Sequence, residues 1–541
     1  MNVLSIYTSH DGAISVSKNN ELIVHCEISR FNKFKHSPLP NYEIIKKIAE
    51  LGIVFDVVLF SDLTDNLTDL WHIFLFGKAT GLKFFKECLN PRAKIIVSKN
   101  HHLFHAACAN TFKKNTNYLV WDGNGAEVTL EKNIIGVEQV SFYGNDLKKI
   151  YKYLYNPHPF NYKKGVLDTS PNNLGIGEAY NFLTRELGLF ASDFFSEGKA
   201  MAFSSFGEFN QKYIDDIIAK NLTFNRNIIS PFPDYSLNKN VSAYENNFNT
   251  EKGNKAAMDF SYTFQKACEF MARQYFKKLN ISEPVTLTGG VTQNILINTD
   301  LSLFFDFDIH YDPICNDQGI SLGHLNHYCG NKIERPNHCY LGFEPEYNLG
   351  IFNEKFKVVD SNTAEVAKIL FEDPVALFQG RSEQGQRALG NRSLLMNATN
   401  LRCIDKINTI KKREWYRPFA CTIMSEFFEK YFIRDSNRSA EFMMNVFKAL
   451  DSKKPYLENV ICPKGTSRVQ ELKKNKNPNF YNLIKAFYDL YQIPFLLNTS
   501  LNKPGTPIIE SLEDLKDMML ETNLKYAYLP EKQKLIIKNE I

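Results

Sequence analysis

A pattern of strand, glycine-containing turn and strand occurs twice near the start of the chain, and it limits the folds that the chain can adopt. The first copy reads VLSIYT, SHDG, AISVSKNN and ELIVHCEIS over residues 3–29; the second reads NYLVWD, GNG, AEVTLEKN and IIGVEQVSFYG over residues 117–144. An Asp-Gly pair stands at the first turn of each copy, Asp11-Gly12 and Asp122-Gly123. Helical segments come after both copies. We therefore predict a duplicated α/β unit with a cleft between its halves. The alternative is two unrelated hairpins that share common turn residues.

The rest of the chain alternates helical and strand patterns. Apolar spacing of three and four residues predicts helices at 178–187, 261–279 and 363–370, and short apolar runs predict strands at 285–288 and 375–378. Residues 330–352 contain Pro, Gly and Asn with little periodicity. We place the main boundary there, which predicts domains at residues 1–345 and 355–541.

Composition excludes several classes of protein. Hydrophobic residues make up 44% of the chain and charged residues 23%, which excludes general disorder. The net charge of +4 is too small to indicate bulk attraction to nucleic acid or to an anionic membrane. The apolar run at residues 51–60 is shorter than the ~18 residues of a membrane-spanning helix. The first residues show no secretory signal pattern. These features predict a soluble, multidomain, cytoplasmic protein.

Histidine and aspartate residues of the first part are candidates for a metal site. All twelve histidines lie within residues 10–338. His101 and His105 are four residues apart and would project from one face of a predicted helix. Asp122 and Asp317 each follow a strand at a glycine-flanked turn. Two nitrogen and two oxygen ligands would suit iron, zinc or manganese. The alternative is a pair of surface histidines on an amphipathic helix.

Other polar residues of this part stand at predicted turns or loops. His10 is a candidate general base, because neutral imidazole accepts a proton near neutral pH; the alternative is a turn histidine without that role. Lys35 is a candidate cation for an anionic ligand, or a solvated loop residue. Gly289 and Gly290 would let a ligand approach the backbone closely, and Asn294 is placed to hydrogen-bond it.

A compact basic segment marks the second part of the chain. Residues 376–418 hold nine lysines and arginines against three acidic residues. Arginine binds phosphate oxygens bidentately, and lysine acts as a mobile point charge. Without histidine, chemistry here must rely on charge neutralisation and positioning, as in reactions at a nucleotide phosphorus. A nucleic-acid backbone site and a solvated basic face are the alternatives. The candidate residues are Arg381, Arg387, Arg392, Lys411, Lys412, Arg413 and Arg417, followed later by Arg468, Asn498, Thr499 and Ser500.

Ten segments together resemble the O-carbamoyltransferase family found in nodulation-factor, cephamycin and aminoglycoside tailoring. They run in order from residue 9 to residue 508, so the resemblance covers nearly the whole chain. The arginine-rich pair and NTSLN are the most specific. The segments are SHDGAISV, SRFNKFKH, NHHLFHAACA, VWDGNGAE, EGKAMAFSSFG, TLTGGVTQN, NDQGISLG, GRSEQGQRALGNRS, KKREWYRPFA and IPFLLNTSLNKPGTPI.

The resemblance implies an actin-like (ASKHA), TsaD-like N-terminal domain and an α/β, YrdC-like C-terminal domain. It implies that carbamoyl phosphate and ATP, with Mg²⁺, give carbamoyl adenylate in the C-terminal domain. The carbamoyl group then passes to an acceptor hydroxyl in the N-terminal domain, where a divalent metal is bound, with iron expected. A sugar, another natural product and a hydroxymethyl-pyrimidine in a nucleotide or DNA stay open as acceptors. A homodimer is compatible with the family.

The resemblance also implies roles for individual residues. It makes His10 the base and Lys35 a ligand contact. Residue type alone adds Asn294, Arg392 and Asn498 as ligand contacts. By similarity the metal ligands are His101, His105, Asp122 and Asp317, and the contacts to carbamoyl phosphate and ATP are Arg387, Lys411, Lys412, Arg417, Arg468 and Ser500.

This sequence departs from the family pattern at four places: the acidic pair before the N-terminal Arg is reduced to Glu27, KAMAFSSFG stands for KVMGLAPYG, and two motifs of the C-terminal part differ. Gln384 and Gln386 replace the aromatic residue and the proline of EFGPRALG, and Cys462 and Lys464 replace the histidine and aspartate of HVDGTAR. These departures predict altered nucleotide contacts. Two other functions stay open: threonylcarbamoyl-type transfer to tRNA, against which the modest net charge speaks, and a non-catalytic, nucleotide-binding actin-like protein.

Overall fold

The computed structural model describes most of the chain. The described residues are 1–61, 88–123, 127–129, 135–157, 173–187, 189, 197–211, 214, 218–219, 223–225, 251–335 and 339–539. Part of the second repeat, residues 124–126 and 130–134, lies outside these ranges.

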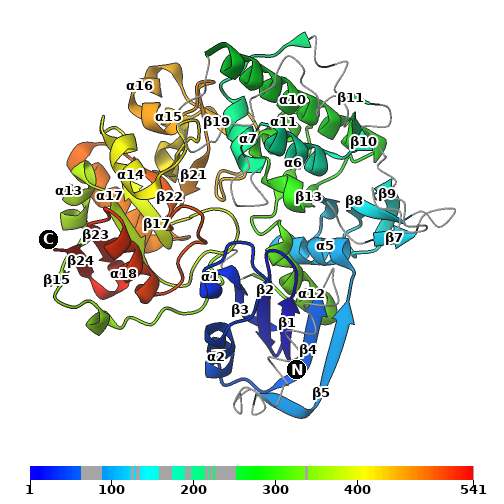
Figure 1. Ribbon diagram of the computed structural model, residues 1–541, viewed down its shortest axis with the longest axis horizontal. Helices are drawn as coiled ribbons and strands as arrows, with labels where there is room; N and C mark the ends of the chain where they lie inside the picture. The colour runs from blue at the N-terminus through cyan, green and yellow to red at the C-terminus, as the bar shows by residue number, and fades with distance from the viewer. Residues whose placement is uncertain are drawn as a thin grey trace.

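The first sheet contains the strands of the first repeat and two later strands. It consists of β1 (Asn2–Tyr7), β2 (Ala13–Lys18), β3 (Glu21–Glu27), β4 (Phe55–Ser61) and β5 (Leu89–Ser98). The strand order is β3-β2-β1-β4-β5, antiparallel from β3 to β1 and parallel from β1 to β5 (Figure 1). Asn19 and Asn20 form the predicted hairpin tip between β2 and β3, with φ values of 53° and 65°.

The second sheet repeats this arrangement. It contains β6 (Asn117–Trp121), β7 (Glu127–Thr129), β8 (Ile135–Tyr143), β9 (Lys149–Pro157), β13 (Val285–Thr288) and β14 (Ile309–Tyr311). Its main strand order is β9-β8-β6-β13-β14. As in the first sheet, the first three strands pair antiparallel and the following pairs are parallel. The sheets therefore confirm the duplication that the sequence pattern predicts. A small sheet of β10 (Asn173–Leu174), β12 (Thr223–Asn225) and β11 (Ile218–Ala219) is separate.

Helices of the first part pack on and between these two sheets. The predicted helices at 178–187 and 261–279 correspond to α6 (Ile176–Glu186) and α10 (Glu251–Lys278). α5 (His101–Phe112) packs closely against α12 (Ile320–Tyr328), because Gly323 has no side chain: a Cβ there would lie 1.7 Å from the Phe104 carbonyl oxygen. Within the described residues of this part, the further helices are α1 (Ser29–Asn32), α2 (Tyr42–Glu50), α7 (Glu197–Ser204) and α11 (Ile295–Phe304).

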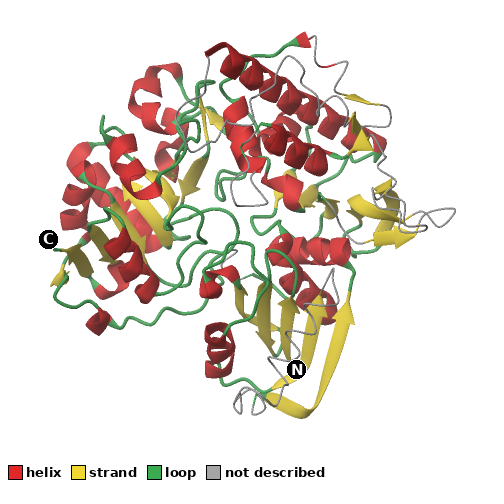
Figure 2. Cartoon of the chain, in the orientation of Figure 1, coloured by secondary structure: helices red, strands yellow, loops and turns green. Residues whose placement is uncertain are grey.

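The C-terminal part forms one mixed sheet with helices around its strands (Figure 2). Its strands, in spatial order, are β15 (Phe356–Asp360), β24 (Lys534–Lys538), β23 (Tyr526–Leu529), β16 (Val375–Phe378), β17 (Arg392–Met396), β22 (Phe495–Ser500), β18 (Ala420–Met424) and β21 (Val469–Leu472). A short pair, β19 (Phe447–Lys448) and β20 (Thr466–Ser467), stands apart. The helices are α13 (Thr363–Glu372), α14 (Cys403–Lys411), α15 (Phe428–Tyr431), α16 (Lys454–Leu457), α17 (Pro478–Tyr491) and α18 (Leu512–Glu521). The predicted strand 375–378 and the helix that begins at 363 are confirmed.

Polar contacts, some of them buried, join the two parts. Arg30 is 1% exposed, and its Nη2 donates to the Glu383 carbonyl oxygen at 2.7 Å. Lys33 Nζ lies 2.6 Å from Asp514 Oδ1. Gln384, one of the departures from the family pattern, accepts a hydrogen bond from the Glu27 amide at 3.2 Å. This glutamine therefore has a structural role at the junction. Within the described ranges, no helix has the length and apolar character that crossing a membrane requires.

Candidate functional site

Four buried side chains come together where the two sheets of the first part meet. His101 Nε2 lies 3.0 Å from Asp122 Oδ2 and 3.5 Å from Asp317 Oδ1. His105 Nε2 lies 3.3 Å from Asp317 Oδ1 and 3.2 Å from His101 Nε2. One ligand atom from each residue falls within 4.8 Å of all the others. The structure thus brings together all four residues predicted as metal ligands; their role as ligands stays a prediction.

The fold explains this convergence. His101 and His105 lie one turn apart at the start of α5, Asp122 follows β6, and Asp317 begins a short 3-10 helix, Asp317–Gly319, after β14. Asp122 Oδ1 accepts hydrogen bonds from the amides of Gly123 at 2.8 Å and Gly290 at 3.2 Å. These amides fix the carboxylate, so its other oxygen faces the histidines.

The chemistry of this donor set fits a divalent transition metal. Nitrogen and oxygen donors in a buried pocket are the ligands that such ions prefer. Burial lowers the pKa of His101, but the Asp317 and Asp122 carboxylates outweigh it and raise that pKa to about 10. Burial raises the pKa values of both carboxyl groups, but the neighbouring histidines outweigh it and hold them below the ordinary value. The cluster is thus an anionic pocket that favours positive charge.

A tyrosine that the sequence did not single out supports this cluster. Tyr7 is 1% exposed, and its Oη donates to Asp317 Oδ2 at 2.6 Å. His10, from the turn after β1, places Nε2 3.3 Å from the same oxygen. Burial lowers the pKa of His10, but the nearby Asp317 and Asp11 carboxylates outweigh burial and raise that pKa to about 9. The position of Tyr7 at the end of the first strand, before the Asp-Gly turn, is the signal that could have indicated it.

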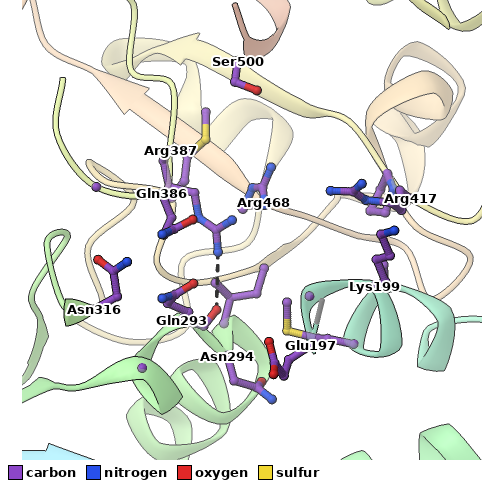
Figure 3. A pocket seen from close by; sticks show the side chains of 18 of the residues that line it. Glu197, Lys199, Gln293, Asn294, Asn316, Gln386, Arg387, Arg417, Arg468 and Ser500 are labelled. Atoms are coloured by element: carbon purple, nitrogen blue, oxygen red, sulfur yellow. Dashed lines mark hydrogen bonds between the residues drawn. The ribbon is translucent and has the colours of Figure 1, made fainter. Parts of the chain in front are cut away.

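One cavity of about 1530 Å³ joins this cluster to the basic segment of the C-terminal part. Figure 3 shows Arg468 and Ser500 on the opposite side of the cavity from Gln293 and Asn294, and Arg387 reaching down to Gln293, with a dashed line marking their hydrogen bond. Predicted site residues that line it include His10, Lys35, Asp122, Asn294, Asp317, Arg387, Lys411, Lys412, Arg417, Arg468, Asn498 and Ser500. The departures Gln386 and Cys462 line it too, whereas Lys464 lies over the Tyr262 ring at 4.6 Å.

Several arginines at the C-terminal end of this cavity have few partners. Arg387 Nη2 donates to the Gln293 carbonyl oxygen at 3.4 Å, and its Nε has no hydrogen-bond partner within the described residues. Among those residues, Arg468 Nε is also buried without a partner. Burial and the nearby arginines lower the pKa of Arg387 to about 10, that of Arg413 to about 9, and that of Arg468 well below its ordinary value. Such a concentration of buried positive charge is typical of an anion-binding site, which stays a prediction here.

Other predicted contacts serve the structure. Arg392 does not line the cavity: its guanidinium donates to the Gln379 and Glu510 carbonyl oxygens at 2.7 and 3.1 Å and lies over the Phe378 ring. We therefore assign it a structural role in place of the predicted ligand contact. Arginine beside glycines looked like a phosphate contact, but sequence alone does not show which side of the strand it faces.

Asn294, Lys411 and Asn498 line the cavity but also hold the backbone. Asn294 Oδ1 caps α11 by accepting from the amides of residues 296 and 297, at 3.2 and 3.1 Å. Lys411 Nζ donates to the carbonyl oxygens of Ser500 and Asn502 at 2.7 and 2.8 Å and to Asn502 Oδ1 at 2.5 Å. Asn498 Nδ2 donates to Thr422 Oγ1 at 2.9 Å. These groups shape the cavity wall as well as facing it.

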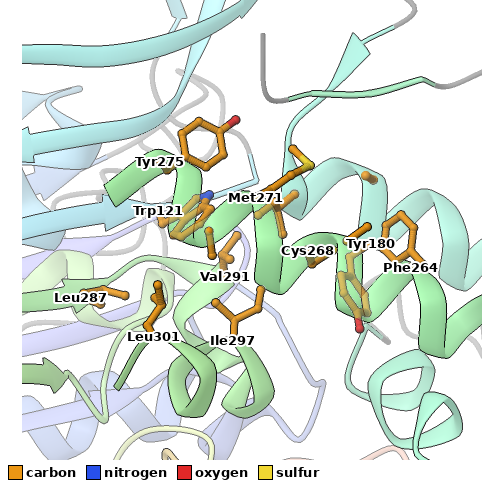
Figure 4. Packing of buried hydrophobic residues seen from close by; sticks show 14 of the residues in the cluster. Trp121, Tyr180, Phe264, Cys268, Met271, Tyr275, Leu287, Val291, Ile297 and Leu301 are labelled. Atoms are coloured by element: carbon orange, nitrogen blue, oxygen red, sulfur yellow. The ribbon is translucent and has the colours of Figure 1, made fainter. Parts of the chain in front are cut away.

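Apolar packing fixes the frame behind the cluster. Trp121, next to Asp122, packs in one core with Val291 and Ile297, which flank Asn294 (Figure 4). Trp121 and Tyr275 meet edge to face, with ring centroids 5.2 Å apart. The site residues are thus held by a rigid core rather than by loops alone.

Comparisons with known proteins identify the family of this chain. Residues 62–324 match the family model "Carbamoyltransferase N-terminus" and residues 366–535 match "Carbamoyltransferase C-terminus". The chain is 27% identical to uncharacterized protein MJ1051 of Methanocaldococcus jannaschii, over 96% of this chain and 97% of that protein. It is 24% identical to the 3'-hydroxymethylcephem-O-carbamoyltransferase of Amycolatopsis lactamdurans, over 95% of each. It is 33% identical to nodulation protein NolO of Bradyrhizobium diazoefficiens, over 49% of this chain and 52% of that protein.

Similarity to solved structures is weaker. The activator of the 2-hydroxyisocaproyl-CoA dehydratase from Clostridium difficile is 12% identical, covers 61% of this chain and 96% of its own, and has a TM-score of 0.34. That score is too low to define a shared fold. The two family models, by contrast, together span most of the sequence. The chain is therefore an enzyme of the carbamoyltransferase family.

Proposed function

We propose that the chain is an ATP-dependent O-carbamoyltransferase that works in two steps. In the first, carbamoyl phosphate gives up its phosphate to water, and the resulting carbamate oxygen displaces pyrophosphate at the α-phosphorus of ATP. The products are carbamoyl adenylate, phosphate and pyrophosphate. In the second, an acceptor hydroxyl attacks the carbamoyl carbon, AMP leaves, and the hydroxyl proton goes to a base.

The observation that carries this proposal is the shared cavity. His10, Asp122 and Asp317 line the same space as Arg387 and Arg468. An intermediate formed beside the arginines can therefore reach the histidine-aspartate cluster within one cavity. This matters because an acyl adenylate reacts with water, and a path within one cavity limits the time it spends in solvent.

The cationic end suits the first step. Two anionic substrates, carbamoyl phosphate and ATP, would neutralise the charge on Arg387, Arg413 and Arg468, whose burial is otherwise unfavourable. Positioning and charge neutralisation are what reaction at phosphorus requires. We assign this step to a YrdC-like domain of residues 355–541 and the transfer step to an actin-like, TsaD-like domain of residues 1–345. The matching strand order of the two N-terminal sheets supports the actin-like assignment.

The histidine-aspartate cluster suits the second step. His101, His105, Asp122 and Asp317 would hold a divalent ion, with iron expected; when bound it would supply Lewis-acid stabilisation of negative charge on the transferring group. His10 lies at the cavity wall beside this cluster. Burial lowers its pKa, and the Asp317 and Asp11 carboxylates raise it to about 9. A divalent ion on the cluster would offset that negative charge, so that neutral His10 would be available to accept the proton of the acceptor hydroxyl.

The C-terminal cations and the loop of Lys35 would hold the adenylate. Lys35 lines the cavity, and its positive charge contributes to lowering the pKa of Lys411, which places it near the anion site. We propose Lys35 as a contact to the phosphate of the intermediate. Its ammonium would thus favour the bound adenylate while the hydroxyl attacks.

The acceptor class is inferred from the relatives. One relative is named for the 3'-hydroxymethyl group of a cephem, which supports a natural-product hydroxyl as the acceptor here. Membership of an enzyme family speaks against a non-catalytic binding protein. Threonylcarbamoyl-type transfer to tRNA is left as an outcome of the test.

The test is ATP–pyrophosphate exchange on purified, metal-supplied protein. We expect exchange that depends on carbamoyl phosphate and is lost in Arg387→Ala, while Arg402→Ala, which removes an exposed arginine of the same part, keeps it. Exchange that instead required threonine and bicarbonate would favour the tRNA-directed alternative. No exchange in folded protein would contradict the adenylation step.

A further inference from the structure

A helix of the N-terminal part and the basic loop of the C-terminal part dock side by side. Lys199 and Phe203 are four residues apart on α7 and share one of its faces, and Phe206 lies in the turn that follows the helix. Three consecutive residues of the loop, Glu414, Trp415 and Tyr416, meet them one by one. We call the segment 412–418 the cation loop.

The contacts between α7 and the cation loop are specific. Lys199 Nζ lies 3.0 Å from Glu414 Oε1, and these side chains are 10% and 15% exposed. The Phe203 and Tyr416 rings meet edge to face with centroids 5.3 Å apart, and the Phe206 and Trp415 rings do so at 4.9 Å. Edge-to-face pairs add to the energy of burial.

Tyr416 of the cation loop is buried in the apolar core of the N-terminal part. It is 1% exposed and belongs to the same apolar cluster as Trp121 and Phe264. Its neighbours on both sides in the sequence, Trp415 and Arg417, are much more exposed than Tyr416. The loop is therefore anchored at one buried point, with the ion pair beside it.

Residues 414–416, which contact α7 and the turn after it, lie between two arginines that line the cavity. Arg413 and Arg417 stand directly before and just after them, and both line the cavity. Arg417 Nη1 lies 3.2 Å from Glu414 Oε2, so one carboxylate holds Lys199 with one oxygen and Arg417 with the other. Figure 3 shows Lys199 and Arg417 facing each other at the same side of the cavity.

We propose that Glu414 and Lys199 are positioning residues for anion binding: Lys199 of α7 fixes Glu414, and Glu414 orients Arg417 toward the bound phosphate. The N-terminal part would then set the geometry of a site whose cations belong to the C-terminal part. The inference rests on the proposed function in one respect, that the cavity binds a phosphate-containing substrate.

For Glu414→Gln, a pure charge effect and a loss of positioning predict opposite changes in anion affinity. Glu414→Gln removes a negative charge beside Arg413 and Arg417, so charge alone would tighten anion binding. Loss of orientation would weaken it, because Arg417 would lose its charge-assisted partner. The direction of the change therefore separates the two explanations.

The experiment measures the affinity for inorganic phosphate by calorimetry, which requires neither ATP nor turnover. We expect about tenfold weaker binding in Glu414→Gln, the size of effect expected for one charge-assisted hydrogen bond. Lys199→Met should bind phosphate about as weakly as Glu414→Gln. Lys199→Arg keeps the ion pair and should bind phosphate as tightly as the unchanged protein. The double variant should be no weaker than either single variant, because the two residues act as one unit.

Controls separate positioning from misfolding. Lys114→Met removes another ion-paired lysine of the N-terminal part, 2.7 Å from Glu334 Oε1, and should leave phosphate binding unchanged. If Glu414→Gln does not fold, Trp415→Ala removes a ring that is 48% exposed and should weaken phosphate binding in the same direction. Melting temperatures of all variants are compared without phosphate.

Three outcomes would overturn the inference. The first is equal or tighter phosphate binding in Glu414→Gln. The second is a loss of phosphate affinity in the double variant that equals the sum of the two single losses. The third is a phosphate affinity in Lys199→Arg as low as that in Lys199→Met. If the unchanged protein binds no phosphate and shows no exchange, the proposed function itself fails. If it binds phosphate and Glu414→Gln binds it equally well, only the role of Glu414 and Lys199 fails.

Discussion

His101 and His105 face each other on one side of α5, with their Nε2 atoms 3.2 Å apart. Two imidazole nitrogens at this distance, with carboxylate oxygens beside them, could hold a metal ion. Replacing both by alanine removes the nitrogen donors, so we expect the bound metal to be lost, from about one ion per chain to a background level. Elemental analysis by mass spectrometry measures this. His327→Ala, at an exposed position of α12, should keep its metal, and an unchanged metal content in the double variant would contradict the site.

Tyr7 should tune this site without being a ligand. Tyr7→Phe removes the hydrogen bond from Oη to Asp317 Oδ2, which is 2.6 Å long. Outer partners of metal ligands typically contribute 10- to 100-fold to metal affinity, and we expect a loss of about tenfold. A competition titration with a chelator measures it. Tyr311→Phe, which removes a buried hydroxyl bonded to the Asn298 carbonyl oxygen at 2.6 Å, should lower stability and leave metal affinity unchanged.

Gly323 should be required for the position of α5. In Gly323→Ala the new methyl group would lie 1.7 Å from the Phe104 carbonyl oxygen, so α12 and α5 must move apart. We expect a loss of stability of about 1–3 kcal/mol and weaker metal binding, measured by scanning calorimetry and metal titration. Gly198→Ala is the matched control: among the described residues, no heavy atom outside its chain neighbours and its own helix backbone lies within 4 Å of the new Cβ, so this helical substitution should keep or raise the melting temperature. Equal melting temperatures for the two variants would contradict the packing argument.

Phosphate binding should take up protons. Burial, together with Arg413 and Arg417, lowers the pKa of Lys411 well below its ordinary value of 10.5. A bound anion raises that pKa again, so binding favours the protonated form and phosphate affinity should fall as the pH rises toward 10.5. Calorimetry in buffers of different ionisation enthalpy measures the proton uptake. A pH-independent affinity over this range would show that Lys411 stays fully charged, held by the carbonyl oxygens of Ser500 and Asn502.

The sequence predicted the fold where local patterns suffice. The two Asp-Gly turns indicated the repeat, and both sheets have the same strand order. The four-residue spacing of His101 and His105 indicated a shared face, and the strand ends indicated Asp122 and Asp317, because the ends of equivalent strands meet at one cleft.

Contacts across the molecule could not be predicted in the same way. Nothing local distinguishes Arg387, which lines the cavity, from Arg392, which faces backbone carbonyl groups. Gln384 departs from the family pattern, yet it bonds to the Glu27 amide instead of a ligand. Lys199 and Glu414 lie in segments that resemble the family, but their pairing depends on how α7 meets the cation loop. Such pairings depend on tertiary structure, and one sequence does not reveal them.

The buried position of Tyr416 has a consequence for biosynthesis. The apolar cluster around Trp121 includes Tyr416 and also Met444, although every other buried member precedes residue 316. While the ribosome is still translating the C-terminal part, the apolar core of the N-terminal part lacks two of its members. This core can pack completely only after residues 416 and 444 have left the exit tunnel. Folding of the nascent chain is therefore completed late, and a stalled or truncated product would expose apolar surface to chaperones.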